Sequence, residues 1–214
     1  MRNKFDEQLL HLNQKMIEMG ALCERFIALC ASALINGDRK GAQEIISNGH
    51  EVDEMEREIE SICLKLLLQQ QPVARDLRQI SAALKMITDM ERIGDQSEDI
   101  AEIIPLLGVM PEIALPDFKL MAQTACKMVT DSIDAFVKKD LQMALSVPKQ
   151  DDIMDECFLR IRKNLITMIS QNSADGESVI DLLMIAKYFE RIGDHAVNIS
   201  EWVEYSFTGV HKGE

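Results

Sequence analysis

The sequence Glu-Arg-Ile-Gly-Asp stands at residues 91–95 and again, letter for letter, at residues 190–194. An internal repeat indicates that one structural unit has been used twice, so it bears on the fold before any single residue does. In both copies the glutamate and the aspartate are four residues apart within a helical pattern, so their carboxylates point the same way. The repeat predicts two similar helical halves, each carrying a pair of acids.

The composition is typical of long packed helices, because 47% of the 214 residues are apolar, only 5% are aromatic and just five are prolines. The five cysteines have no CxxC spacing and lie at apolar helical positions, which indicates reduced core thiols. The net charge of -13 argues against nucleic-acid binding and against direct contact with an anionic membrane. Because neither a secretory signal nor an apolar run of about 18 residues is present, we expect a cytoplasmic protein that meets membranes only through partners.

Apolar residues at alternating steps of three and four predict a long first helix. Its apolar positions are Leu12, Met16, Met19, Cys23, Phe26, Cys30 and Ala33. The sequence Asn-Gly-Asp at residues 36–38 ends this helix, since glycine suits the position past a helix end and aspartate caps the next helix. We expect a second helix toward Gln71 and a third that ends at Ile104.

The second half repeats this plan. Helices are expected from about Asp117 to Lys138, from about Asp140 to Ser170 and from Glu177 to Phe207. Pro148 falls inside the second of these and should kink or interrupt it, because proline lacks the N–H that a helix interior needs.

Residues 105–116 contain three prolines and Gly108 and are interpreted as a linker. The predicted domains are therefore a three-helix bundle at residues 1–104 and a similar one at residues 117–214. Helices of about 30 residues are about 45 Å long, so the molecule should be elongated. The fold class predicted is all-α, with six long helices in two tandem, similar three-helix bundles.

The repeated acids flank the apolar stripe of their helices instead of opposing it, as Glu91 lies about 40° around the helix from Ile87. Carboxylates beside a buried face are unfavourable unless they are paired or bind cations. The preceding helix of each half carries further acids, Asp53 and Glu56 in the first half and Asp151 and Asp155 in the second. Antiparallel neighbours could bring all these acids together as a metal site.

An acidic surface with intrahelical ion pairs is the alternative, since Arg92 can reach Asp95 and Arg191 can reach Asp194. If a metal binds, oxygen ligands favour hard cations such as Mg²⁺, Mn²⁺ or Fe³⁺ over a closed zinc site of cysteine and histidine. A ferritin-like di-iron site would need Glu-x-x-His pairs, which neither copy has. We expect His195 to form a hydrogen bond at the rim of the site instead of ligating.

Several motifs together resemble the PhoU family of phosphate-uptake regulators. They are the two Glu-Arg-Ile-Gly-Asp segments, the sequence Gln-Pro-Val-Ala-Arg-Asp-Leu-Arg at residues 71–78 and the pair Met19-Gly20. The resemblance covers essentially the whole chain. It implies a cytoplasmic adapter, dimeric in many members, that links the phosphate-specific ABC transporter to the PhoR sensor kinase and represses the phosphate regulon.

The resemblance also implies multinuclear iron or zinc clusters held by E/D-x-x-x-D pairs. Carried over to this chain, the second site is complete and the first is not, because Gly49 stands where an acid is usual. Unless His50 or Glu56 substitutes, this loss should weaken the first site, so we expect unequal metal occupancy of the two halves. The metal-ligating residues predicted are Asp151, Asp155, Glu190 and Asp194 in the second site and Asp53, Glu91 and Asp95 in the first.

The resemblance implies a non-catalytic adapter that binds the transporter ATPase subunit and a PhoR-type kinase. The sequence fits this expectation, since it contains no nucleophile with a matched base and no glycine-rich phosphate loop. One alternative is a carboxylate-bridged metalloenzyme, because bound metals activate water. Others are an accessory protein of a different inorganic phosphate transporter and a metal-free helical scaffold.

Overall fold

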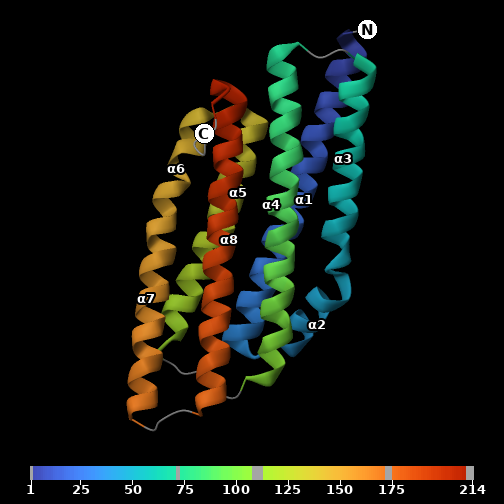
Figure 1. The fold of residues 1–214 in the computed structure, drawn as a ribbon. Coiled ribbons are helices and arrows are strands. Elements are labelled where there is room, and N and C mark those ends of the chain that lie inside the picture. Colours follow the sequence, from blue (N-terminus) through green and yellow to red (C-terminus); the bar gives the residue numbers. More distant parts are fainter. Residues whose placement is uncertain (1, 71–72, 108–112, 172–174, 211–214) are drawn as a thin grey trace.

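The protein is helical along nearly all of the chain that the structure describes (Figure 1). This computed structural model describes residues 2–70, 73–107, 113–171 and 175–210. The helices of the first half are α1 (Arg2–Asn36), α2 (Arg39–Asn48), α3 (His50–Gln70), α4 (Ala74–Ile103) and the short 3₁₀ helix η1 (Ile104–Leu106). The helices of the second half are α5 (Leu115–Lys138), α6 (Leu141–Ser146), α7 (Pro148–Ser170) and α8 (Gly176–Thr208).

The six long helices expected from the sequence are confirmed, and two of them are interrupted near their start. As predicted, Pro148 interrupts the fifth helix, and α7 begins at this residue because a first turn does not need its missing N–H. The break between α2 and α3 at Gly49 was not expected, and Gly49 keeps helical dihedral angles there (φ −51°, ψ −40°). Asp38 caps α2 as predicted, since its side chain accepts hydrogen bonds from the Lys40 and Gly41 N–H groups.

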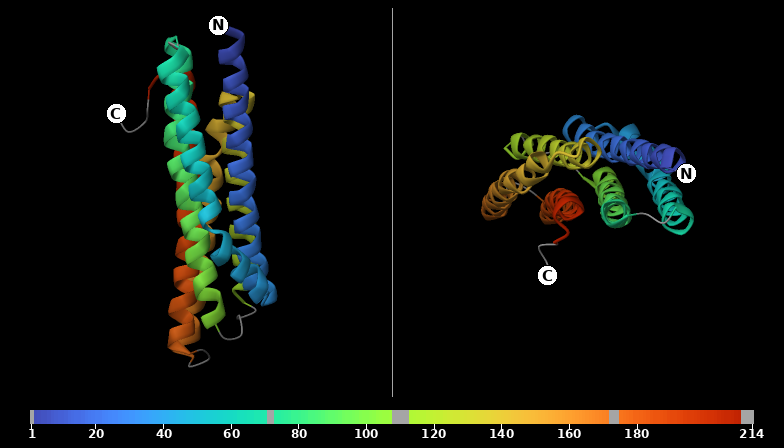
Figure 2. Two further views of the ribbon diagram at one scale, coloured as in Figure 1. Left: turned by 90° about the vertical axis from the view of Figure 1, so that its right-hand side faces the viewer. Right: turned by 90° about the horizontal axis from the view of Figure 1, so that it is seen from above.

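The helices form two layers that run along a common direction (Figure 2). Helices α1 and α5 lie side by side in one layer, and α3, α4, α8 and α7 follow one another in the other. Helices α4 and α8, which carry the repeated motif, are antiparallel neighbours at the middle of this second layer (Figure 1). The two halves therefore pack against each other along their length, and the molecule is elongated.

One continuous core joins the two halves. The seam predicted for α1 is buried, with Met16, Met19 and Phe26 at 0% exposure. Gly20 lets α1 approach α5 closely, because a Cβ there would collide with the side chain of Ile133 on α5. The cysteines are free thiols, as expected from the sequence, and Cys126 alone among them is incompletely buried in the described residues.

The predicted linker at residues 105–116 lies partly outside the described residues, since residues 108–112 are not described. Before this gap the chain forms η1, and after it α5 begins at Leu115. The domain boundaries proposed from the sequence stay a prediction. Within the described residues, no helix has both the length and the apolar character that crossing a membrane requires.

Candidate metal centre

The α3–α4 hairpin brings together the acids of the first predicted site. Asp53 on α3 and Glu91 and Asp95 on α4 each offer an oxygen atom, and these atoms lie within 4.8 Å of one another. The helices can approach this closely because Gly94 has no side chain. A Cβ on Gly94 would lie only 3.1 Å from the methyl groups of Val52. Gly94 thus acts as a packing glycine that positions carboxylates on both sides of the hairpin.

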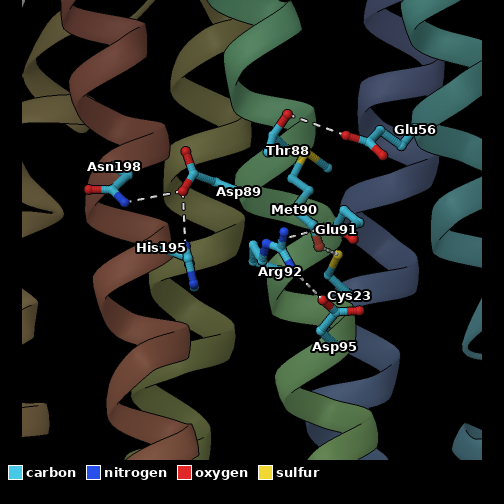
Figure 3. Close-up of polar contacts among 10 residues, drawn as sticks. All are labelled: Cys23, Glu56, Thr88, Asp89, Met90, Glu91, Arg92, Asp95, His195 and Asn198. Carbon is cyan, nitrogen blue, oxygen red and sulfur yellow. Dashed lines mark hydrogen bonds and ion pairs between the residues drawn. The ribbon is translucent and has the colours of Figure 1, made fainter.

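The first cluster holds more negative charge than its neighbours neutralise. Burial, followed by the nearby Asp95 carboxylate, raises the pKa of Glu91. Glu91 Oε2 is buried and has no hydrogen-bond partner. Arg92 offsets part of the charge, since its guanidinium lies 2.8 Å from Asp95 Oδ2 and 3.4 Å from Glu91 Oε2 (Figure 3). A bound cation would satisfy the orphaned Glu91 oxygen.

The α7–α8 hairpin carries the second predicted set, Asp151 and Asp155 on α7 and Glu190 and Asp194 on α8. Burial, followed by the negative charges of Asp194, Asp155 and Glu190, raises the pKa of Asp151 to about 6. Burial and Glu190 likewise raise the pKa of Asp194. Asp151 Oδ1 is buried without a partner and lies 3.0 Å from the place where a Cβ on Gly193 would stand. Gly193 therefore leaves room for this carboxylate.

The two clusters differ in geometry. Among the described residues, the first set alone has its ligand atoms within 4.8 Å of one another. In the second set Lys187, one turn before Glu190 on α8, forms an ion pair with Glu190. The unequal occupancy expected from the sequence stays a prediction, as do the ligand assignments.

Of the two expected intrahelical ion pairs, Arg92 with Asp95 is confirmed and Arg191 with Asp194 is wrong. Within the described part of the chain, Arg191 forms no ion pair with Asp194. Its charge instead reaches across to α4, where it lowers the otherwise raised pKa of Asp99. The packing of α8 against α4 explains this difference, because it offers Arg191 an acid from the other half.

His50 and Glu56 were the two residues considered as substitutes for the acid missing at Gly49, and neither supplies the atoms nearest to that position. His50 is exposed, and Glu56 accepts a hydrogen bond of 3.3 Å from Thr88 on α4 (Figure 3). The space beside Gly49 is filled by Glu98, whose Oε2 would lie 2.5 Å from a Cβ at position 49. The sequence shows Glu98 on the acidic edge of its helix but cannot show this contact.

A polar bridge joins the two halves between the clusters (Figure 3). His195 Nδ1 on α8 lies 2.9 Å from Asp89 Oδ1 on α4, and the Asn198 side-chain amide donates to the same oxygen at 3.1 Å. The expectation that His195 forms a hydrogen bond is confirmed. Its partner Asp89 was missed, because the contact spans the two repeats and leaves no local spacing to find.

The donor sets fit a hard metal cation. All the converging donors are carboxylate oxygens, which suit Mg²⁺, Mn²⁺ and ferric iron, and carboxylates also ligate zinc. Each hairpin has one buried carboxylate oxygen without a hydrogen-bond partner, Glu91 Oε2 in the first and Asp151 Oδ1 in the second. A cation bound there would take the place of the missing partner. Bound there, a cation would neutralise carboxylates that otherwise repel one another.

Comparison with known proteins defines the class of the chain. The family model of the PhoU domain matches it twice, at residues 16–104 and 118–203. A phosphate-specific transport system accessory protein PhoU homolog of Clostridium acetobutylicum is 35% identical over 210 residues, which are 97% of this chain and 96% of that protein. The homolog of Zymomonas mobilis is 34% identical over 206 residues, 96% of this chain and 87% of that protein.

Solved structures agree. The crystal structure of PhoU from Pseudomonas aeruginosa matches with a TM-score of 0.90 at 31% identity and covers 96% of this chain and 100% of that one. The phosphate transport system regulatory protein PhoU from Streptococcus pneumoniae matches with a TM-score of 0.87 at 26% identity, covering 97% of this chain and 98% of that one. The chain belongs to the PhoU family.

Proposed function

We propose that this protein is a PhoU-type negative regulator of phosphate uptake: a cytoplasmic, non-catalytic adapter between the phosphate-specific ABC transporter and a PhoR-type histidine kinase. The proposed association with the transporter is supported by relatives that match this chain over nearly its whole length. These relatives are named as accessory proteins of the phosphate-specific transport system. The ATPase subunit is the transporter component that a cytoplasmic adapter can reach. Assembly as a homodimer is part of the proposal and rests on the family resemblance.

The proposal includes metal binding by both carboxylate clusters, with iron or zinc as the cations. The observation that carries this part is that one buried carboxylate oxygen in each of the two equivalent hairpins, Glu91 Oε2 and Asp151 Oδ1, lacks a hydrogen-bond partner. Burying a carboxylate oxygen without a partner is unfavourable, and a metal ion removes that penalty. The cations would act structurally, by fixing the hairpins, or as modulators of the surface that partners meet.

A non-catalytic role agrees with the state of the thiols. Burial raises the pKa of Cys23 and of Cys63 to about 12 and that of Cys126 to about 11, so these groups stay protonated and unreactive at neutral pH. Among the residues that the structure describes, His195 bonds to Asp89 and to no serine or cysteine, so these thiols and this imidazole do not form a nucleophile with its base there.

The test is capture of the purified transporter ATPase subunit and of the kinase by metal-loaded protein, with and without phosphate. A variant with Asp151, Asp155, Glu190 and Asp194 replaced by their amides should lose part of this capture together with its metal. The matched control removes the same number of charges from outside the cluster on the same helices, by replacing Asp152, Glu156, Glu177 and Asp181. If wild-type protein captures neither partner under any phosphate or metal condition, the adapter proposal is wrong.

One observation favours a second candidate, a carboxylate-bridged metalloenzyme. The buried, partnerless Asp151 Oδ1 faces the other acids of its hairpin, and a metal ion held by such a carboxylate cluster could activate water for hydrolysis. Phosphoester cleavage by Fe-, Zn- or Mn-loaded protein, abolished by Glu190→Ala, would establish it. Absence of turnover with all three metals would exclude it in favour of the adapter.

A further inference from the structure

The two hairpins carry the same packing contact, which fixes how their residues correspond. Val52 packs against Gly94 in the first hairpin, and Met154 packs against Gly193 in the second. The residues three positions before Val52 and Met154 are therefore equivalent, and they are Gly49 and Asp151. The first hairpin thus lacks the carboxylate that Asp151 supplies to the second.

The structure shows what fills the vacant place beside Gly49. A Cβ on Gly49 would lie 2.5 Å from Oε2 and 2.9 Å from Cδ of Glu98, so the Glu98 carboxylate occupies the space of the missing side chain. Glu98 comes from the opposite helix of the hairpin, α4. In the second repeat its equivalent on α8 is Val197, which packs against the core. One carboxylate is present at this level in each hairpin, on α7 in the second and on α4 in the first.

Glu98 lies beside the first cluster and outside the group of three acids whose ligand atoms lie within 4.8 Å of one another. Burial raises its pKa, and the charges of Glu102, Asp95 and Asp53 raise it further. Within the described residues Glu98 takes part in no hydrogen bond or ion pair, while Arg92 is engaged by Glu91 and Asp95. Its charge is thus partly buried, close to two predicted ligands and not neutralised.

We infer that Glu98 is a metal ligand of the first cluster and replaces the acid that Gly49 lacks. The cation is of the hard, oxygen-preferring class that the proposed function assigns to this cluster, and the inference rests on that proposed function. Helix α4 would then supply three of the ligands, with Asp95 between Glu91 and Glu98 along the helix. The first site is then as rich in carboxylates as the second, with a different distribution between its helices.

The test isolates the first cluster by working in a background with Asp155→Asn and Asp194→Asn, and it measures Zn²⁺ and Mn²⁺ affinity by calorimetry. Glu98→Gln should weaken binding at least tenfold, since even outer-shell partners of a metal contribute about 10- to 100-fold. The matched control is Glu102→Gln, which removes an acid one turn further along α4 and should change affinity by less than about threefold. Equal effects of the two substitutions would overturn the inference.

A swap variant tests the replacement itself. Gly49→Asp combined with Glu98→Val gives the first hairpin the pattern of the second, and it should restore affinity lost in Glu98→Val alone. Gly49 has helical dihedral angles, so the backbone accepts aspartate there once Glu98 is removed. Failure of the folded swap variant to regain affinity would contradict the exchange of one carboxylate for another.

The apo fold of every variant is checked by far-UV circular dichroism, and if the swap variant does not fold, the comparison of Glu98→Gln with Glu102→Gln decides alone. If the background protein binds neither Zn²⁺ nor Mn²⁺, the proposed metal function of this cluster fails, and the inference with it. If it binds them with full affinity in Glu98→Gln, the metal function stands and the role of Glu98 is wrong.

Discussion

Replacing Asp151 with asparagine should stabilise the metal-free protein, although it removes a predicted metal ligand. The folded protein raises the pKa of Asp151 from 3.8 to about 6, through burial and the surrounding acids. At about 1.4 kcal/mol per pKa unit, a shift of roughly two units corresponds to about 3 kcal/mol of destabilisation. Because the side chain is only partly buried, solvent screening reduces this to about 1–1.5 kcal/mol.

The pH dependence follows from the direction of this shift. Between about pH 4 and pH 6 the folded protein holds a proton on Asp151 that the unfolded chain has released, so stability falls as pH rises through this window. Above pH 7 the penalty is complete, and toward pH 4 it vanishes. Asp151→Asn removes the titration, so its stabilising effect should be complete at pH 7.5 and reduced to about a third at pH 4.5.

The assay is thermal unfolding followed by far-UV circular dichroism at these pH values, in the presence of a chelator. For a chain of this length the expected gain corresponds to a rise in Tm of about 2–5 °C at pH 7.5. The control is Asp152→Asn, which changes an exposed neighbour on the same helix. A variant no more stable than wild type at pH 7.5, or equally stabilised at both pH values, would refute the electrostatic account of this cluster.

Other predictions concern the core, the bridge between the halves, a helix cap and the metal. Phe189→Ala should lower the free energy of unfolding by about 3–5 kcal/mol in urea titrations, because Phe189 is fully buried on α8. Asp89→Ala should lower it by about 1–3 kcal/mol by leaving His195 and Asn198 without their shared acceptor; an unchanged urea midpoint would contradict this. Asp175→Ala should remove about 1 kcal/mol, since its side chain caps α8, and Asp175→Ser should restore most of it. Zinc at about one hundred times its Kd should add about 2.7 kcal/mol to the stability, and a Tm that does not respond to zinc or to chelator would instead support a metal-free scaffold.

The helices and their buried faces could be predicted from the sequence, because both depend on local periodicity. Met16 and Phe26 follow the apolar spacing of the first helix, and the structure buries both. Pro148 begins α7, because a residue without an N–H fits the first turn of a helix and not its interior. The repeat also pointed to the acids that lie at equivalent positions of α4 and α8. Asp53, Glu91 and Asp95 come together because antiparallel hairpin packing follows from two helices and a short connection.

Contacts between distant segments could not be predicted in this way. The bond from His195 to Asp89 joins the two repeats, and the charge of Arg191 acts on Asp99 of α4, because α4 and α8 are neighbours in space and not in sequence. The Glu98 carboxylate in the space beside Gly49 depends on how closely α4 approaches the junction of α2 and α3. Helical spacing places each of these side chains on a face, but tertiary packing decides what that face meets.

Metal content per chain is the measurement that tests the central claim most directly, namely that both carboxylate clusters hold cations. Elemental analysis after loading with iron or zinc should give bound metal in wild-type protein and a partial loss in each of Asp95→Asn and Asp194→Asn. The double variant should retain the helical fold and lose nearly all its metal. Metal retained in full by either single variant would contradict binding at that cluster, and metal retained by the folded double variant would contradict the claim itself.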